Sequence, residues 1–282
     1  MRRIYLLCCV IITTALAGGC SALSFAYNNA PSFIASELDD AFDLDDAQEG
    51  QLELRLQKFF AWHRQHELPR YQKTMNTAAI AIADGISAAE FLEISAELQL
   101  AWRRILTKAI DDLGDFALTL SPAQIDHFQQ YMYEEAEEYR DYLEMTAQQR
   151  TIFRVKRGLK RLQDWFGKLD EGQQEKISLR LKQLPEFYPA WISYRDARQQ
   201  ALLVALRAAA TEGLSRQQLK FILLDPTSDY ARKFEPSRTA YWRSYAQAIE
   251  DISGLLRKSQ LQHAVNRLLD YAETTAELAR DN

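Results

Sequence analysis

The sequence is short of the residues that interrupt helices and of those that build redox or metal sites. Its 282 residues include only 10 glycines, 7 prolines and 3 cysteines, whereas long stretches are rich in Ala, Leu, Glu, Gln and Arg. This composition favours helices. Cys8 and Cys9 lie within the first apolar segment, and Cys20 closes it. The rest of the chain has no thiol for a disulfide bond, a thiolate metal site or a cysteine nucleophile.

The sequence also lacks the positive charge of a nucleic-acid-binding protein and the motifs of the common enzymes. The net charge is −5, and a mildly acidic chain is a poor partner for nucleic acid. No phosphate-binding loop, dinucleotide fingerprint or Ser-His-Asp order is present. We therefore expect no cofactor, no nucleic-acid partner and no enzymatic activity.

The first twenty residues, by contrast, have the features of a bacterial lipoprotein signal peptide. Two arginines precede an apolar run, 4–17, which is too short to span a membrane comfortably. Small residues then lead to a cysteine in Leu16-Ala17-Gly18-Gly19-Cys20-Ser21. This pattern predicts removal of residues 1–19 and acylation of Cys20. The alternative is an ordinary secretory signal that is cut at the same small residues.

A lipid on Cys20 predicts where the protein resides. A single acyl chain gives only marginal membrane binding, whereas a triacylated cysteine gives stable anchoring. The next residue is Ser21 rather than the aspartate that typically retains lipoproteins in the inner membrane of enteric bacteria. We therefore expect a lipid-anchored protein on the periplasmic face of the bacterial outer membrane.

After Cys20 the sequence predicts an all-α fold. Residues 20–43 are expected to form a lipidated tether with a short helix near 31–42, and residues 44–282 a helical domain. Apolar residues recur at helical spacing along this domain, as in Ile152, Val155, Leu159, Leu162 and Phe166. We expect roughly eight to ten helices, arranged as an irregular multi-helix bundle of antiparallel helical hairpins.

Helix starts are marked by capping boxes, in which Ser, Thr or Asp is followed three residues later by Gln or Glu. The first side chain accepts a hydrogen bond from a free amide of the first turn, and the second reaches back to the capping residue. The predicted boxes are Asp45…Gln48, Ser87…Glu90, Ser121…Gln124, Thr146…Gln149, Asp170…Gln173, Ser215…Gln218 and Ser259…Gln262.

Four short segments carry a resemblance to a known family. They are Gly19-Cys20-Ser21, Tyr27-Asn28-Asn29-Ala30-Pro31, Trp62-His63-Arg64 and Leu68-Pro69-Arg70-Tyr71. In these segments the chain resembles an uncharacterised family of Gram-negative outer-membrane lipoproteins, and the resemblance covers the whole mature chain. It implies a helical, lipid-anchored protein with no known activity, so it adds a location but no mechanism.

A second resemblance rests on residues at the predicted helix starts. These are Leu120-Ser121-Pro122-Ala123-Gln124, Met145-Thr146-Ala147-Gln148-Gln149 and Leu169-Asp170-Glu171-Gly172-Gln173. They are similar to the Leu-Thr-x-x-Gln motif of periplasmic stress chaperones related to spheroplast protein Y. Those chaperones are shorter and carry no lipid. The likeness implies that the protein is a holdase, which binds unfolded chains.

Two histidines, His63 and His66, are the candidates for a metal site. Their spacing places both on one face of a helix, next to Glu67. No Glu-x-x-His or His-Glu-x-x-His pattern accompanies them. The alternative is that His63 and Arg64 satisfy buried carbonyl or carboxylate groups while Trp62 packs.

A basic run provides the candidate binding surface. Helical spacing places Arg150, Arg154, Arg157 and Arg161 along one stripe. The simpler interpretation is that these arginines pair with an acidic run at 134–138. The functional interpretation is that they contact anionic lipid headgroups, peptidoglycan or an acidic protein.

The sequence therefore predicts a membrane-anchored binding or envelope-assembly component. Two other functions remain open. A chaperone-like holdase would need exposed apolar or aromatic surfaces, and an enzyme acting on envelope polymers would need a cleft with convergent carboxylates.

Overall fold

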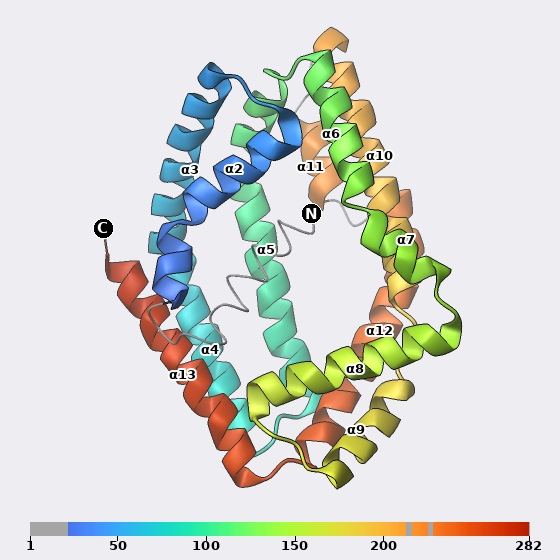
Figure 1. Ribbon diagram of the computed structural model, residues 1–282. Coiled ribbons are helices and arrows are strands. Elements are labelled where there is room, and N and C mark those ends of the chain that lie inside the picture. Colours follow the sequence, from blue (N-terminus) through green and yellow to red (C-terminus); the bar gives the residue numbers. More distant parts are fainter. Residues whose placement is uncertain (1–21, 213–215, 225–227, 282) are drawn as a thin grey trace.

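The computed structural model describes residues 22–212, 216–224 and 228–281, and these residues form an all-α fold (Figure 1). The predicted signal peptide, 1–19, and Cys20 lie outside the described residues. Residues 22–28 are helical, and the elements that follow are α2 (Ala30–Phe42), α3 (Asp46–His66), α4 (Leu68–Ala83), α5 (Ala88–Ala117), α6 (Pro122–Glu134), α7 (Glu137–Glu144), α8 (Ala147–Phe166), α9 (Glu171–Lys182), α10 (Tyr188–Glu212), α11 (Arg216–Leu224), α12 (Asp229–Ser253) and α13 (Lys258–Arg280). The predicted all-α fold is confirmed, and α2 is the short helix expected near 31–42.

Among the described helices, none is both long enough and apolar enough to cross a membrane.

Capping boxes define most of the helix starts that the sequence predicted. The reciprocal hydrogen bonds are present at Asp45, Ser87, Ser121, Thr146 and Asp170. The predicted box Ser215…Gln218 begins at a residue outside the described ones. Helices α4 and α7 begin without a side-chain cap, which is why the structure has more helices than the caps indicated.

The predicted box Ser259…Gln262 was wrong. Helix α13 begins two residues earlier, with Arg257 at the capping position, and Oε1 of Gln260 accepts a hydrogen bond from the Arg257 amide at 2.9 Å. The reason lies in the tertiary structure, because Gln260 is buried and bonded to Gln173 of α9, at 2.8 Å. This contact fixes the position at which α13 can begin.

Glutamines of the capping boxes join helix starts in two pairs. Gln124 Nε2 of α6 donates to Gln48 Oε1 of α3 at 2.6 Å, and each of these amides also reaches a backbone carbonyl of the other connection. Gln173 and Gln260 make the same arrangement between α9 and α13. The Leu-x-x-x-Gln segments ending at Gln124 and Gln173 therefore act as joints between helices.

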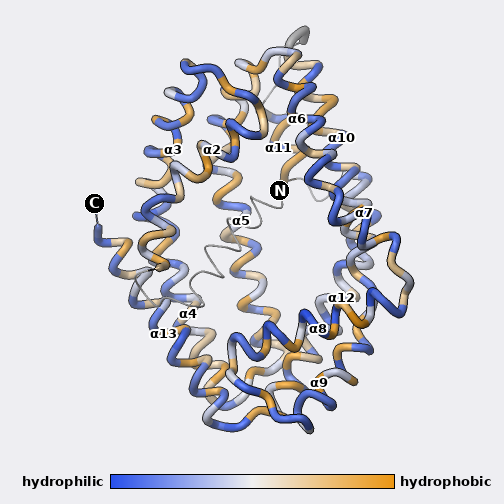
Figure 2. Tube along the Cα trace, in the orientation of Figure 1, coloured by the Kyte–Doolittle hydropathy of each residue, from blue (hydrophilic) through white to orange (hydrophobic). Residues whose placement is uncertain are grey.

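The helices pack through separate apolar clusters. One large cluster joins α2, α3, α5, α6, α10 and α11, and another joins α8, α9 and α12. The longest helix pairing is between elements far apart in the sequence, since α4 runs antiparallel to α13 (Figure 1). Figure 2 shows hydrophobic and hydrophilic residues interleaved along the helices, as amphipathic packing requires.

Candidate binding pocket

Helix α8 carries the predicted arginine stripe. Its apolar side, with Val155 and Leu162 buried, packs on Ile177 of α9. The two helices approach closely at Gly158, where an added Cβ would lie 2.7 Å from Cδ1 of Leu181. This packing fixes the rotation of α8 about its axis, and it thereby sets the direction of the neighbouring arginines.

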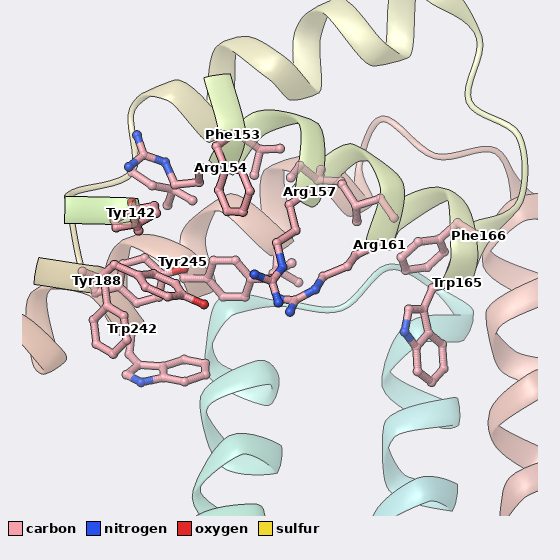
Figure 3. A pocket seen from close by; sticks show the side chains of 18 residues that line it. Tyr142, Phe153, Arg154, Arg157, Arg161, Trp165, Phe166, Tyr188, Trp242 and Tyr245 are labelled. Atoms are coloured by element: carbon pink, nitrogen blue, oxygen red, sulfur yellow. The ribbon is translucent and has the colours of Figure 1, made fainter. Parts of the chain in front are cut away.

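Three arginines of the stripe, Arg154, Arg157 and Arg161, line a pocket of about 460 Å³. Aromatic residues from α7, α8, the α9–α10 connection, the start of α10 and α12 line the rest of the pocket. Figure 3 shows Arg157 and Arg161 extending from α8 toward the aromatic side chains of α12. The aromatic residues that line the pocket are Tyr142, Phe153, Trp165, Phe166, Phe187, Tyr188, Tyr241, Trp242 and Tyr245.

The aromatic side of the pocket is held together by ring contacts. Tyr241 stacks on Phe187 with a centroid separation of 4.5 Å, and on Tyr245 at 5.7 Å. Tyr142 and Tyr188 lie 5.0 Å apart. Each of these five rings contacts a ring from another helix turn or another element, and such contacts stabilise this part of the pocket wall.

The arginines differ in what they contact. Arg150, at the end of the stripe, pairs with Glu186 at 2.7 Å and does not line the pocket. Nη2 of Arg154 donates to the Lys182 carbonyl at 3.5 Å, while its buried Nε has no acceptor among the described residues. Arg157 and Arg161 are exposed, and neither forms an ion pair with a described carboxylate. The described lining contains no Asp or Glu.

The structure thus separates the four predicted arginines. Arg154, Arg157 and Arg161 come together in the pocket, whereas the ion pair of Arg150 is to Glu186 in the α9–α10 connection rather than to the acidic run. Among the described residues, the stripe forms no ion pair with the acidic run at 134–138.

Burial raises the pKa of two tyrosines that line the pocket on α12. It raises the pKa of Tyr241 to about 12, with a smaller opposing effect from the nearby guanidinium of Arg154. It also raises the pKa of Tyr245, against the effect of Arg161. These phenols remain hydrogen-bond donors at neutral pH, so the pocket offers cations and neutral donors to a ligand.

The aromatic residues of the pocket were not predicted from the sequence. Tyr241 and Tyr245 are spaced by four residues on α12, with Trp242 beside them, and that spacing was the available signal. It could not show that this face of α12 lies opposite α8, because the two helices are separated by three others in the chain.

The histidines proposed for a metal site have separate surroundings. His63 is buried and its Nδ1 lies 2.9 Å from the hydroxyl of Tyr27. His66 is exposed, stacks on Trp62 and bonds through Nδ1 to the Trp62 carbonyl. No group of three or more metal-ligating side chains occurs in the part of the chain that the structure describes.

Residues of the family-like segments meet around His63. Arg64 donates to the Leu278 carbonyl at 2.9 Å and to Asn28 Oδ1 at 3.1 Å. Tyr27 packs with Leu68 and Leu278 in one apolar cluster. Part of the segment expected to be a tether is therefore packed onto α3, α4 and α13.

The fold and the pocket define an all-α protein with a cationic, aromatic-walled site. The chain belongs to DUF6279, a family of unknown function, whose model matches residues 40–234. The matched region contains α8 and the aromatic residues of α7 and α10, but it does not reach Cys20 or Tyr241. No curated protein and no solved structure matches the chain.

Proposed function

We propose that the protein is a membrane-anchored binding component of the bacterial envelope, which holds an anionic ligand in the arginine pocket. The observation that carries this proposal is the exposure of Arg157 and Arg161 to a pocket with no described carboxylate. Guanidinium groups bind phosphate and carboxylate through paired hydrogen bonds. An uncompensated cationic pocket attracts such groups, and it does so more strongly at low ionic strength.

The proposed anchor is the lipid on Cys20. Tyr27, seven residues further on, is buried against the domain, and seven residues span at most roughly 25 Å. A lipid at Cys20 would therefore hold α3 and α13 close to the membrane surface. The anchor would then keep the pocket among the components of the envelope.

Substitution of Cys20 by alanine is expected to release the protein from membranes. Without the thiol no diacylglyceryl group can be attached, and stable anchoring requires more than one acyl chain. The measurement is membrane fractionation combined with the intact mass of the mature protein. A mature chain that starts at Ser21, or that carries no lipid on Cys20, would contradict the proposed anchor.

Charge reversal of the pocket, in the double variant Arg157→Glu and Arg161→Glu, is expected to abolish salt-sensitive binding. Both side chains are exposed and lack described ion partners, so each reversal should change the stability by less than about 1 kcal/mol. The measurement is co-sedimentation of residues 21–282 with anionic vesicles and with peptidoglycan across a salt series.

The matched control for this experiment is Lys156→Glu with Lys160→Glu. These lysines are exposed on the same helix but do not line the pocket. The control has the same change in net charge, so it should retain most of the binding. Equal loss in both variants would indicate a general charge effect, and no binding by the unmodified protein would exclude the proposal.

The holdase alternative draws support from a different surface. Leu98 and Trp102, one turn apart on α5, are 56% and 55% exposed. Holdase activity would depend on these apolar side chains and would be insensitive to the reversal of Arg157 and Arg161. The third possibility, an enzyme acting on envelope polymers, requires convergent carboxylates, which the described lining of this pocket does not offer.

A further inference from the structure

We infer that the ligand of this pocket is an amphiphile carrying a phosphate monoester, an inference that rests on the proposed function. The lining of the pocket combines two chemistries. Arg154, Arg157 and Arg161 come from α8, and aromatic rings come from α7, α10 and α12 as well as from α8 itself. An inorganic anion would leave the rings in water, and a hydrocarbon would leave the cations without a partner.

The floor of the pocket extends the apolar side. Leu162, Leu184 and Ile252 line the pocket, and all three are buried. A volume of about 460 Å³ lies within the usual range for the site of one small molecule. The apolar part of the ligand is therefore expected to enter the pocket rather than to rest on its rim.

The charge of the pocket selects the anionic group. Three arginines line the space, with Arg157 and Arg161 extending toward the rings of α12, and no described carboxylate lines it. A phosphate monoester carries roughly 1.5 to 2 negative charges at neutral pH, whereas a carboxylate carries one. Its three terminal oxygens can accept from more than one guanidinium at once.

Arg154 adds positive charge to the same lining. Its Nη2 donates to the Lys182 carbonyl, and its buried Nε has no hydrogen-bond acceptor among the described residues. Because that Nε is not accessible from the pocket, Arg154 acts on a ligand through its charge. Oxygens of a bound phosphate would supply the acceptors that Arg157 and Arg161 lack among the described residues.

The experiment measures binding of three probes to residues 21–282, which include every described residue. The probes are octyl phosphate, inorganic phosphate and the neutral octyl glucoside. Binding is followed by calorimetry and by the fluorescence of Trp165 and Trp242, which line the pocket. Octyl phosphate is expected to bind at least tenfold more tightly than inorganic phosphate, since burial of two methylenes corresponds to about tenfold in affinity. It is also expected to bind at least tenfold more tightly than octyl glucoside, which has the same chain but no charge for the arginines to pair with.

Substitutions in the pocket test which residues bind the phosphate of the ligand and which bind its apolar part. Arg157→Gln with Arg161→Gln should weaken octyl phosphate at least tenfold, and the exposed control Lys156→Gln with Lys160→Gln should not. Trp242→Ala should weaken octyl phosphate but leave inorganic phosphate unchanged. Circular dichroism confirms that each variant is folded.

Three outcomes would overturn the inference. Equal affinity for octyl phosphate and inorganic phosphate would show that the pocket binds anions alone. Equal affinity for octyl glucoside would show an apolar site without phosphate selectivity. If the protein binds phosphatidic acid vesicles and octyl phosphate does not compete with this binding, the phosphate is recognised at a bilayer surface and not in the pocket. In each case salt-sensitive binding to vesicles or peptidoglycan would still support the proposed function. If the protein shows no such binding, the proposed function and the inference about its ligand are both wrong.

Discussion

Replacing Glu67 by glutamine is expected to lower the free energy of unfolding by about 3 kcal/mol. Glu67 is 1% exposed at the junction of α3 and α4. Its two carboxylate oxygens accept from Nε and Nη2 of Arg104 on α5, each at 2.8 Å. Glutamine would keep the shape but remove the counter-charge of Arg104. The Arg104 side chain is 28% exposed, so partial hydration keeps the cost near the lower end for buried pairs.

The measurement is urea denaturation of residues 21–282, with Asp112→Asn as the control. Asp112 pairs with Arg55 at 2.7 Å, but both side chains are partly exposed, so this substitution should cost at most about 1 kcal/mol. The double variant Glu67→Gln with Arg104→Leu should recover part of the loss, because it removes the unpaired charge. Equal effects of Glu67→Gln and Asp112→Asn would show that burial of the pair contributes nothing.

Stability is expected to fall as the pH is lowered from about 6.5 to about 4, by roughly 3 kcal/mol from His63 alone. Burial, and to a smaller degree Arg64, lowers the pKa of His63 from 6.5 to about 4, against an opposing effect of Glu67. In this window the unfolded chain takes up a proton at His63 that the folded chain does not. The contribution is therefore fully present above pH 6.5 and is lost as the pH falls toward 4.

The test compares the pH dependence of the unfolding free energy in three proteins. His63→Gln should remove this part of the slope, since glutamine does not titrate. His66→Gln replaces an exposed histidine three residues away and should keep the slope of the unmodified protein. If His63→Gln has the unmodified slope, then His63 does not hold its neutral form in the folded state.

Local features of the fold were predictable from the sequence. The capping boxes at Asp45, Ser87, Ser121, Thr146 and Asp170 are correct because both partners lie within one helical turn, so no distant contact is needed to form them. The capping box predicted at Ser259 was wrong. Helix α13 has Arg257 at its capping position instead, because Gln260 bonds to Gln173, a residue 87 positions away in the chain.

The pairing between helices was harder to predict from the sequence. The sequence suggested hairpins of neighbouring helices, whereas the longest pairing joins α4 to α13. An amphipathic stripe predicts which face of a helix is buried, but it does not predict which other helix packs against that face. Glu67 and Arg104 illustrate the same limit, since neither charge by itself indicated a buried pair.

The sequence alone determined the all-α fold, most helix starts and a stripe of arginines on α8, because helical spacing and local hydrogen bonds depend only on neighbouring residues. Only the tertiary structure decided what the stripe does. The packing of α8 on α9 turns Arg157 and Arg161 toward α12, where Tyr241 and Tyr245 line the same pocket. The same packing leaves Arg150 paired with Glu186 outside it. A pocket is a property of surfaces that face each other, and the chain brings these surfaces together only when it folds.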